Sequence, residues 1–411
     1  MPQFNLLTEL HRSHDWLCDR NILVPEQLVE SLPTPTLRIA GCDVVSFCSN
    51  NYLGLSHHPR VMSAAARALE TFSFATSESR RLGGNLAILE ELENALARYK
   101  RMPAAMVTAT GLLANVAAIH GIVDAAQLAR RWYGAPADER TAVVLYDTES
   151  HRSIRMGARL GDAVRRPFRH NDADHLAELL HEHRGDAVLV ITEGVFSMDG
   201  DLGNLPEIAD VCDGVGALLL VDDAHGTGVY GPGGAGTVEH FGLTGRIPLQ
   251  VATLSKAFGG MGGALLADER TVAMLRLFAS GYRFTSSLPA EVAAGLLEAV
   301  MIAQREPALR SRLWENARRL RDGLAGLGLG VRGEGPIIPL IVGSSDTAMA
   351  LEEQLLKRGF WSAAVAPPLV KPDECRLRLT VTAMHTPDQI DGLLTALSEI
   401  LVPGAGYTLF P

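Results

Sequence analysis

Short apolar runs recur along this 411-residue chain, and they constrain its fold more than any other feature. From about residue 60 to 290 the runs alternate with helical patterns. The runs are apolar on both faces, as strands are when helices cover both sides of a sheet. Such an alternation predicts an α/β fold with a mostly parallel sheet. The candidate strands are residues 105–108, 142–147, 187–193, 217–223, 249–255 and 263–267.

The pattern changes near Leu288, and this change predicts a second domain. A long helical stretch is expected over 290–327, followed by a strand in GPIIPLIVG, a helix around 351–358, a strand in CRLRLTVT and a final helix. This order indicates a smaller α+β domain. We predict a large domain over 61–289, a small domain over 290–411, and an N-terminal segment over 1–60 with a helix and short strands that packs on the small domain.

Composition and charge exclude several classes of protein. The 37 basic and 47 acidic residues give a net charge of −10, which argues against a nucleic-acid partner or a membrane surface. No apolar run reaches the roughly 18 residues of a membrane span, and the first residues do not resemble a signal peptide. The five cysteines never form CxxC, which favours reduced thiols over a metal site or disulfides. We expect a cytoplasmic protein with no bound metal.

Polar residues follow the candidate strands, and ligands of open α/β sheets bind at the carboxyl ends of strands. Lys256 lies between an apolar strand and the glycine-rich FGGMGG. Partial burial would lower the pKa of this lysine and favour Schiff-base formation, although an isolated loop lysine is more often simply solvated. Asp222 ends an apolar run, where a carboxylate needs a cation. A protonated pyridine nitrogen would answer that need; a helix cap or a magnesium site is the alternative.

Two histidines and a glycine turn complete the candidate site. His225 would reach the same ligand as Asp222, and His151 could stack on a flat cofactor, although a lone histidine is more often structural. The segment TATGLLAN places Gly111 and Leu112 at a strand-to-helix turn, where free amides favour a phosphate. The sequence contains no GxxxxGK[ST] and no strand-linked GxGxxG. ATP and dinucleotide sites are therefore disfavoured.

Five motifs resemble those of a known family. They are SNNYLGL, TEGVFSMDGD, DDAHGTGVYG, TLSKAFGGMGG and RLRLTVTAMHT, at residues 49–55, 192–201, 222–231, 253–263 and 376–386. In this order they resemble the α-oxoamine synthases, pyridoxal-phosphate-dependent C-acyltransferases of fold type I, over nearly the whole chain. The resemblance implies a seven-stranded sheet and a homodimer with shared active sites. It also implies that a small amino acid condenses with an acyl thioester of CoA or an acyl-carrier protein, with loss of CO₂, to give an α-amino ketone.

The resemblance assigns a role to each matching residue. Lys256 looks like the lysine that bonds to the cofactor, and Asp222 like the partner of the ring nitrogen. His225 and Ser197 would approach the phenolic oxygen, while His151 would stack on the ring. The remaining residues match phosphate and substrate contacts. The amides of Gly111 and Leu112 and the side chain of Thr253 would bind the phosphate within one subunit, Thr285 and Ser286 would bind it from the other subunit, and Asn50 and Arg378 would bind the amino-acid carboxylate.

Some positions differ from the family pattern, and they border the expected acyl-donor channel and cofactor rim. These residues are Glu78, Leu89, Leu112, Ala366 and Leu369. The stretch over 124–141 is also longer than expected. Ser79 stands where glycine-specific relatives carry threonine, which favours alanine or serine as substrate. An enzyme like glycine C-acetyltransferase, without decarboxylation, and another fold-type I aminotransferase or lyase are the alternatives.

Overall fold

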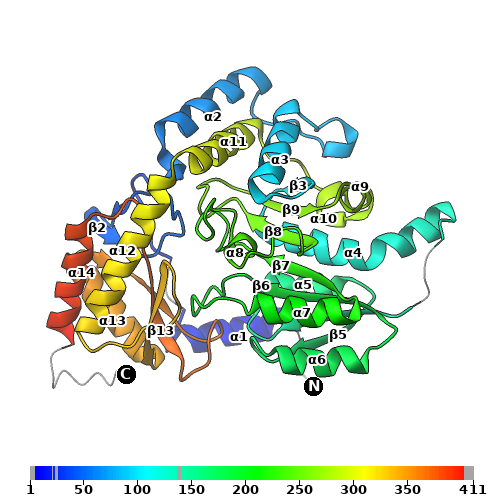
Figure 1. The fold of residues 1–411 in the computed structure, drawn as a ribbon. Helices are drawn as coiled ribbons and strands as arrows, with labels where there is room; N and C mark the ends of the chain where they lie inside the picture. Colours follow the sequence, from blue (N-terminus) through cyan, green and yellow to red (C-terminus); the bar gives the residue numbers. More distant parts are fainter. Residues whose placement is uncertain (1–4, 21, 24–25, 137–139, 402–411) are drawn as a thin grey trace.

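The computed structural model describes residues 5–20, 22–23, 26–136 and 140–401. Its centre is a seven-stranded sheet in the order β3-β9-β8-β7-β6-β4-β5 (Figure 1). β9 is antiparallel to both of its neighbours, β3 and β8, and all other pairs of neighbouring strands in this sheet are parallel. The predicted α/β fold with a mostly parallel seven-stranded sheet is therefore confirmed. The strands are β3 (Ala104–Thr108), β4 (Ala142–Asp147), β5 (Val164–Phe168), β6 (Ala187–Glu193), β7 (Leu218–Asp222), β8 (Leu249–Thr253) and β9 (Gly263–Ala267).

The strand that the apolar runs did not reveal is β5, with the sequence VRRPF. It pairs only with β4, at the edge of the sheet. Four of its five residues are exposed. An edge strand tolerates charged residues and proline because one of its sides has no neighbour. The apolar pattern that identifies buried strands is therefore absent here.

Helices cover both faces of the sheet because successive side chains of a strand point to opposite sides. In β6, Leu189 and Ile191 pack in one cluster with residues of α4 and α5, while Val190 packs in another with residues of α6 and α7. α9 also covers the first face. The bounds are α4 (Gly111–Tyr133), α5 (Arg152–Leu160), α6 (Ala173–Glu182), α7 (Leu205–Val215) and α9 (Glu269–Phe278).

Within the described residues, α4 is the one helix long and apolar enough to cross a membrane by length and composition. Half of the most apolar 18-residue stretch of this helix is buried. The helix contacts α5, α9, β8 and β9. Its apolar length is thus accounted for by packing on the central sheet.

The helical stretch expected over 290–327 consists of two helices. α11 (Ala290–Arg305) ends before α12 (Pro307–Gly326) begins. Pro307 lacks an amide hydrogen and fits the first turn of a helix, not its interior. α11 packs on α2 (Pro59–Phe72) and α3 (Ala87–Lys100), whereas α12 leads to the C-terminal part of the chain (Figure 1).

The C-terminal part is α+β. The strands β10 (Ile337–Gly343), β12 (Ala363–Val365) and β13 (Cys375–Thr380) form an antiparallel sheet in the order β10-β13-β12. α13 (Ser345–Lys357) contacts this sheet, and α14 (Pro387–Ile400) packs on α12 and α13.

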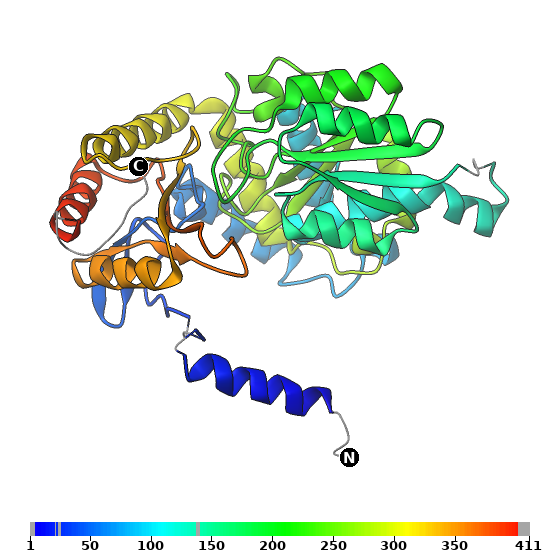
Figure 2. The same ribbon diagram turned by 90° about the horizontal axis from the view of Figure 1, so that it is seen from below.

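Part of the N-terminal segment joins the C-terminal part. The hairpin of β1 (Thr36–Ile39) and β2 (Cys42–Ser46) pairs with β11 (Phe360–Trp361), which lies parallel to β2. α1 (Leu6–Cys18) contains no buried residue and projects away from the rest of the chain (Figure 2). The division into three parts remains a prediction. Short elements complete the fold: η1 (Leu55–His57), η2 (Arg80–Leu82), α8 (Thr237–His240) and α10 (Ser280–Arg283).

Candidate active site

A cavity of about 270 Å³ lies at the carboxyl ends of the parallel strands. The register places Glu193, the last residue of β6, opposite Asp222, the last residue of β7. Thr253 ends the neighbouring strand β8. The structure thus collects strand-end side chains at one edge of the sheet. Of the residues predicted from the sequence, the cavity is lined by Gly111, Leu112, His151, Ser197, Asp222, His225, Thr253 and Lys256.

The amine of Lys256 is held in a partly desolvated position. Burial lowers the pKa of Lys256 to about 8, although the charges of Asp222 and Glu193 oppose this shift. Within the described part of the chain, the amine makes no hydrogen bond or ion pair. In its neutral form, which the lowered pKa makes more accessible, an amine without hydrogen-bond partners can attack an aldehyde or accept a proton.

Asp222 is oriented by a residue that the sequence did not reveal. Asn115 donates from Nδ2 to Asp222 Oδ2 at 2.6 Å, and the Ala224 amide donates to Asp222 Oδ1 at 3.1 Å. Asn115 is 3% exposed and lies one turn after Gly111 in α4. The carboxylate is thereby fixed at the cavity, and no cationic side chain of the described residues donates a hydrogen bond to it. A cationic ligand would complete it.

The start of α4 forms an anion site beside this carboxylate. Thr110 caps the helix by accepting from the Leu113 amide at 3.1 Å. The amides of Gly111 and Leu112 have no partner in the described chain. A Cβ atom at Gly111 would lie 2.5 Å from Thr253 Oγ1, so this close approach of backbone and hydroxyl requires glycine. Two free amides and a hydroxyl at a helix N-terminus suit a phosphate.

His225 and Arg378 lie at the two ends of one hydrogen-bonded chain. Tyr52 joins them, because its hydroxyl lies 2.7 Å from His225 Nδ1 and 3.3 Å from Asn50 Oδ1. Asn50 Oδ1 accepts from both terminal nitrogens of Arg378, at 3.3 and 3.4 Å. Arg378 also donates to the Ser197 carbonyl at 2.7 Å. Asn50 and Arg378 therefore lie together beside the cavity, although neither lines it.

His151 begins α5 at another strand end. Its Nδ1 lies 2.7 Å from Ser153 Oγ, and its amide donates to Glu193 Oε1. Burial lowers the pKa of His151, with Lys256 and Arg155 acting in the same direction and Asp222 opposing it. Burial and the neighbouring Asp222 raise the pKa of Glu193 well above its ordinary value. The site therefore contains a neutral imidazole and a carboxyl group that resists ionisation.

Two predicted phosphate contacts lie outside this cavity. Thr285 and Ser286 do not line it; Ser286 instead pairs with Ser79 in an isolated β-bridge. Among the departures from the family pattern, Leu112 lines the cavity, whereas Leu89 is fully buried in the core. The others do not line it. Glu78 and Leu369 are exposed and Ala366 is partly buried, while part of the stretch over 124–141 lies outside the described residues.

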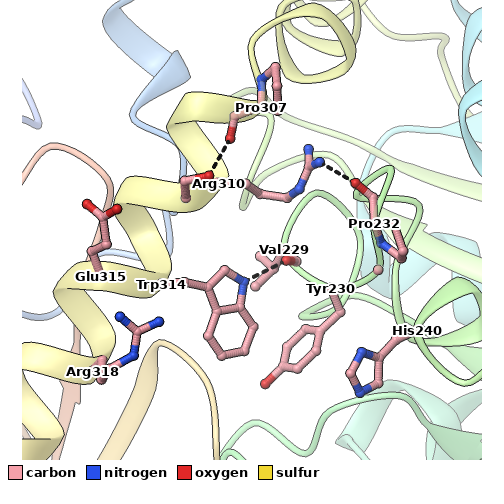
Figure 3. Close-up of a pocket in the computed structure, with 11 residues that line it drawn as sticks. Val229, Tyr230, Pro232, His240, Pro307, Arg310, Trp314, Glu315 and Arg318 are labelled. Carbon is pink, nitrogen blue, oxygen red and sulfur yellow. Dashed lines mark hydrogen bonds between the residues drawn. The ribbon is translucent and has the colours of Figure 1, made fainter.

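A second, larger cavity of about 730 Å³ lies between α12 and the loop before α8. Tyr230, Trp314 and His240 form its aromatic wall, and Arg310 donates to the Pro232 carbonyl (Figure 3). No lysine or carboxylate from the strand ends faces it. Across the described residues, no group of His, Cys, Asp and Glu side chains has metal-site geometry. The strand-end chemistry is thus confined to the smaller cavity.

Three residues of the site escaped the sequence analysis. Glu193 lies within TEGVFSMDGD and Tyr52 within SNNYLGL, but neither motif assigned a role to them. Asn115 carried a signal, since it is a polar residue on the buried face of an otherwise apolar helix. A buried amide of that kind usually has a polar partner, and here the partner is Asp222.

The residues fit pyridoxal phosphate. The free amides of Gly111 and Leu112 match the phosphate, and the fixed carboxylate of Asp222 matches a ring cation. The unengaged amine of Lys256 matches the aldehyde. Asn115 Oδ1 remains buried without a partner in the described chain. The site therefore contains a hydrogen-bond acceptor that its own residues do not satisfy.

Sequence comparisons identify extensive similarity to known enzymes. Residues 42–397 match the family model described as aminotransferase class I and II. A Desulforudis audaxviator protein provisionally named as an 8-amino-7-oxononanoate synthase is 42% identical over 361 residues, covering 88% of this chain and 90% of that protein. The 8-amino-7-oxononanoate synthase of Methylococcus capsulatus is 39% identical over 375 residues, covering 91% and 93%.

Structural comparison extends the similarity to the whole molecule. A serine palmitoyltransferase from S. paucimobilis with bound PLP–myriocin aldimine superimposes with a TM-score of 0.88 at 31% identity, covering 96% of this chain and 98% of that chain. An 8-amino-7-oxononanoate synthase from Francisella tularensis has a TM-score of 0.70 at 23% identity, covering 87% and 97%. The latter similarity concerns the fold alone.

Proposed function

Since the chain belongs to the aminotransferase class I and II family, and within it to the α-oxoamine synthases, we propose that it joins alanine or serine to an acyl thioester with loss of CO₂. The reaction class follows from the family: the protein is a pyridoxal-phosphate-dependent acyltransferase that condenses an amino acid with an acyl thioester. This places it apart from the aminotransferase and lyase alternatives. An α-amino ketone is the expected product.

The single observation that carries the residue assignment is the meeting of three groups at one cavity. Lys256, Asp222 and the start of α4 at Gly111 supply an amine, an anion and a phosphate site. Pyridoxal phosphate, when bound, supplies an electron sink for a carbanion at the amino-acid α-carbon. The protein's contribution is to hold that sink, the substrates and the transferred proton in place.

We assign the carboxylate of the amino acid to Arg378. Arg378 is 9% exposed, and its guanidinium is oriented by the Ser197 carbonyl, Asn50 and the Thr380 hydroxyl. A planar guanidinium can donate two parallel hydrogen bonds to a carboxylate. Holding the carboxylate there would turn the α-carbon and its proton toward the cavity.

Lys256 is then the base. With a pKa of about 8, a larger fraction of its Nζ is neutral near physiological pH than in an ordinary lysine, and this neutral amine can take the α-proton of the amino acid. Asp222 would pair with the ring nitrogen of bound pyridoxal phosphate and favour its protonated form. His151, a neutral imidazole at the start of α5, is placed to assist at the acyl oxygen.

Alanine or serine is favoured over glycine because Ser79 stands where glycine-specific relatives carry threonine. The names of the relatives support a substrate larger than glycine. In 8-amino-7-oxononanoate the amine-bearing carbon lies beside the ketone and carries a further carbon, as it would after alanine has lost its carboxylate. The name serine palmitoyltransferase indicates that serine is the amino acid used by that enzyme.

The family is typically dimeric. We propose that this chain forms a homodimer in which each active site contains residues of both subunits. Thr285 and Ser286 would bind the phosphate in the partner's site. Phe74, Leu82 and Phe284 support a partner at this surface, because they are 75%, 77% and 77% exposed and lie on the two segments joined by the bridge between Ser79 and Ser286. Large exposed apolar side chains of this kind mark interaction surfaces. The cytoplasmic location and the choice between CoA and a carrier protein stay predictions.

The test combines the holoenzyme with alanine, serine or glycine and a series of acyl-CoA thioesters, and it measures free thiol. Amino acid labelled in the carboxylate would release labelled CO₂ if decarboxylation occurs. Lys256→Ala should remove both the visible absorbance of the bound cofactor and the turnover. Full activity in that variant, or thiol release with glycine alone and no CO₂, would overturn the proposal.

A further inference from the structure

Tyr52 is a buried phenol whose hydroxyl contacts two residues of the site. It is fully buried, and its hydroxyl lies 2.7 Å from His225 Nδ1 and 3.3 Å from Asn50 Oδ1. The Tyr52 and His225 rings pack edge to face, with centroids 6.1 Å apart. Burial raises the pKa of Tyr52 to about 12, so the phenol retains its single proton for a hydrogen bond.

The two acceptors of that proton are not equivalent. The contact with His225 Nδ1 is short, whereas the contact with Asn50 Oδ1 is at the long end of hydrogen-bond distances. Asn50 Oδ1 already accepts from Arg378. We therefore assign the phenol proton to the short contact, with Nδ1 as its acceptor.

His225 has one ring proton left to place. Burial lowers the pKa of His225 well below its ordinary value, and Lys256, Arg378 and His151 act in the same direction. The ring is thus neutral, with one nitrogen protonated. If Nδ1 accepts from Tyr52, the proton lies on Nε2, which has no hydrogen-bond partner within the described chain and belongs to a residue that lines the cavity.

We propose that Tyr52 is a positioning residue that holds His225 in the tautomer with its proton on Nε2, an inference that rests on the proposed cofactor site. In this tautomer His225 presents an N–H donor to the cavity. The phenolic oxygen of pyridoxal phosphate is an acceptor, and the matching group for it is a donor. The other tautomer would present a lone pair to that oxygen and weaken the contact.

The tautomer can be measured without cofactor or turnover. The apoprotein is labelled with ¹⁵N-histidine, and the ring nitrogens are observed by long-range ¹H–¹⁵N correlation. His225→Gln identifies the His225 signals by their loss. We expect an unprotonated Nδ1 and a protonated Nε2 in the unmodified chain. A protonated Nδ1 there would overturn the proposal, whether or not any Tyr52 variant folds.

Tyr52→Phe removes only the hydroxyl, and Tyr230→Phe is its matched control. Tyr230 is 2% exposed, packs between Trp314 and His240 (Figure 3), and its hydroxyl has no partner within the described chain. Tyr52→Phe should move the His225 nitrogens toward a mixture of tautomers and weaken pyridoxal phosphate binding about 2- to 10-fold. It should also change the pH profile of the bound cofactor's absorbance. Tyr230→Phe should leave all three measurements unchanged.

The outcomes separate this inference from the proposed function. If Tyr52→Phe folds and leaves the His225 tautomer unchanged, the positioning role fails, even though the acyltransferase proposal stands. If Lys256→Ala retains the absorbance and activity of the unmodified enzyme, the cofactor assignment fails, while the tautomer measured in the apoprotein still reports on the Tyr52–His225 contact.

Discussion

At the scale of single residues, the site depends on opposed electrostatic influences on one amine. Burial disfavours the Lys256 cation, and Arg378 adds to this effect, whereas Asp222 and Glu193 favour the cation. The balance places the pKa near the pH at which a base is most effective. The same residue would be a poor base on the surface, where its amine would remain protonated.

The pH dependence of Lys256 labelling tests this balance. In the apoprotein, modification of Lys256 by an amine-reactive reagent should rise with pH through a midpoint of about 8, since only the neutral amine reacts. Asp222→Asn should shift the midpoint to lower pH, because it removes the negative charge that most strongly favours the Lys256 cation. Mass spectrometry of the peptide containing Lys256 gives the extent of modification. A midpoint near the ordinary value of 10.5 would contradict the assignment.

At the scale of elements, the turn after β7 is anchored by a buried ion pair behind the site. Lys100, the last residue of α3, donates to Asp223 Oδ2 at 2.5 Å, and both side chains are fully buried. Asp223 Oδ1 accepts from the Thr237 hydroxyl at 2.6 Å. Because Asp222 and His225 flank Asp223, this anchor fixes the turn that carries both of them.

Breaking the ion pair should destabilise the protein. Lys100→Met leaves the Asp223 carboxylate buried without its cation, which should reduce the free energy of unfolding by about 3–5 kcal/mol. Adding Asp223→Asn should recover part of that loss. Urea denaturation gives both values. Lys357→Met is the control, since the Lys357–Glu353 pair is exposed and should contribute less than about 1 kcal/mol. Equal losses in the two single variants would refute the anchoring role.

At the scale of the whole molecule, the site draws on distant parts of the chain. Asn50 and Arg378, which are 328 residues apart in sequence, meet because the segment after β2 lies against the end of β13, where the Thr380 amide donates to the Phe47 carbonyl at 2.7 Å. Thr285 and Ser286 lie outside the cavity of their own chain. A complete phosphate site is therefore expected only in the dimer.

Subunit mixing tests this arrangement. Lys256→Ala chains and Thr285→Val/Ser286→Ala chains should each show little activity as homodimers. When they are refolded or coexpressed together, each mixed dimer would contain one site with all native residues, so activity should return to roughly a quarter of the unmodified value. Thiol release and sedimentation analysis give activity and assembly. Mixed dimers no more active than the parents would rule out shared sites.

The sequence by itself determined the buried strands of the central sheet and the residues at their ends. Both are local properties, because an apolar run and the polar residue that follows it are adjacent in the chain. The motifs also sufficed to identify the family and its cofactor. The polar edge strand β5 and the break before Pro307 were missed, since neither follows a simple apolar period.

Only the tertiary structure decided how separate segments complete one another. Asn115 orients Asp222 from 107 positions away, and Tyr52 reaches His225 across 173. No local pattern specifies such contacts, because they depend on how helices and domains pack on the sheet. Packing also sets the burial around Lys256, and burial is what lowers its pKa.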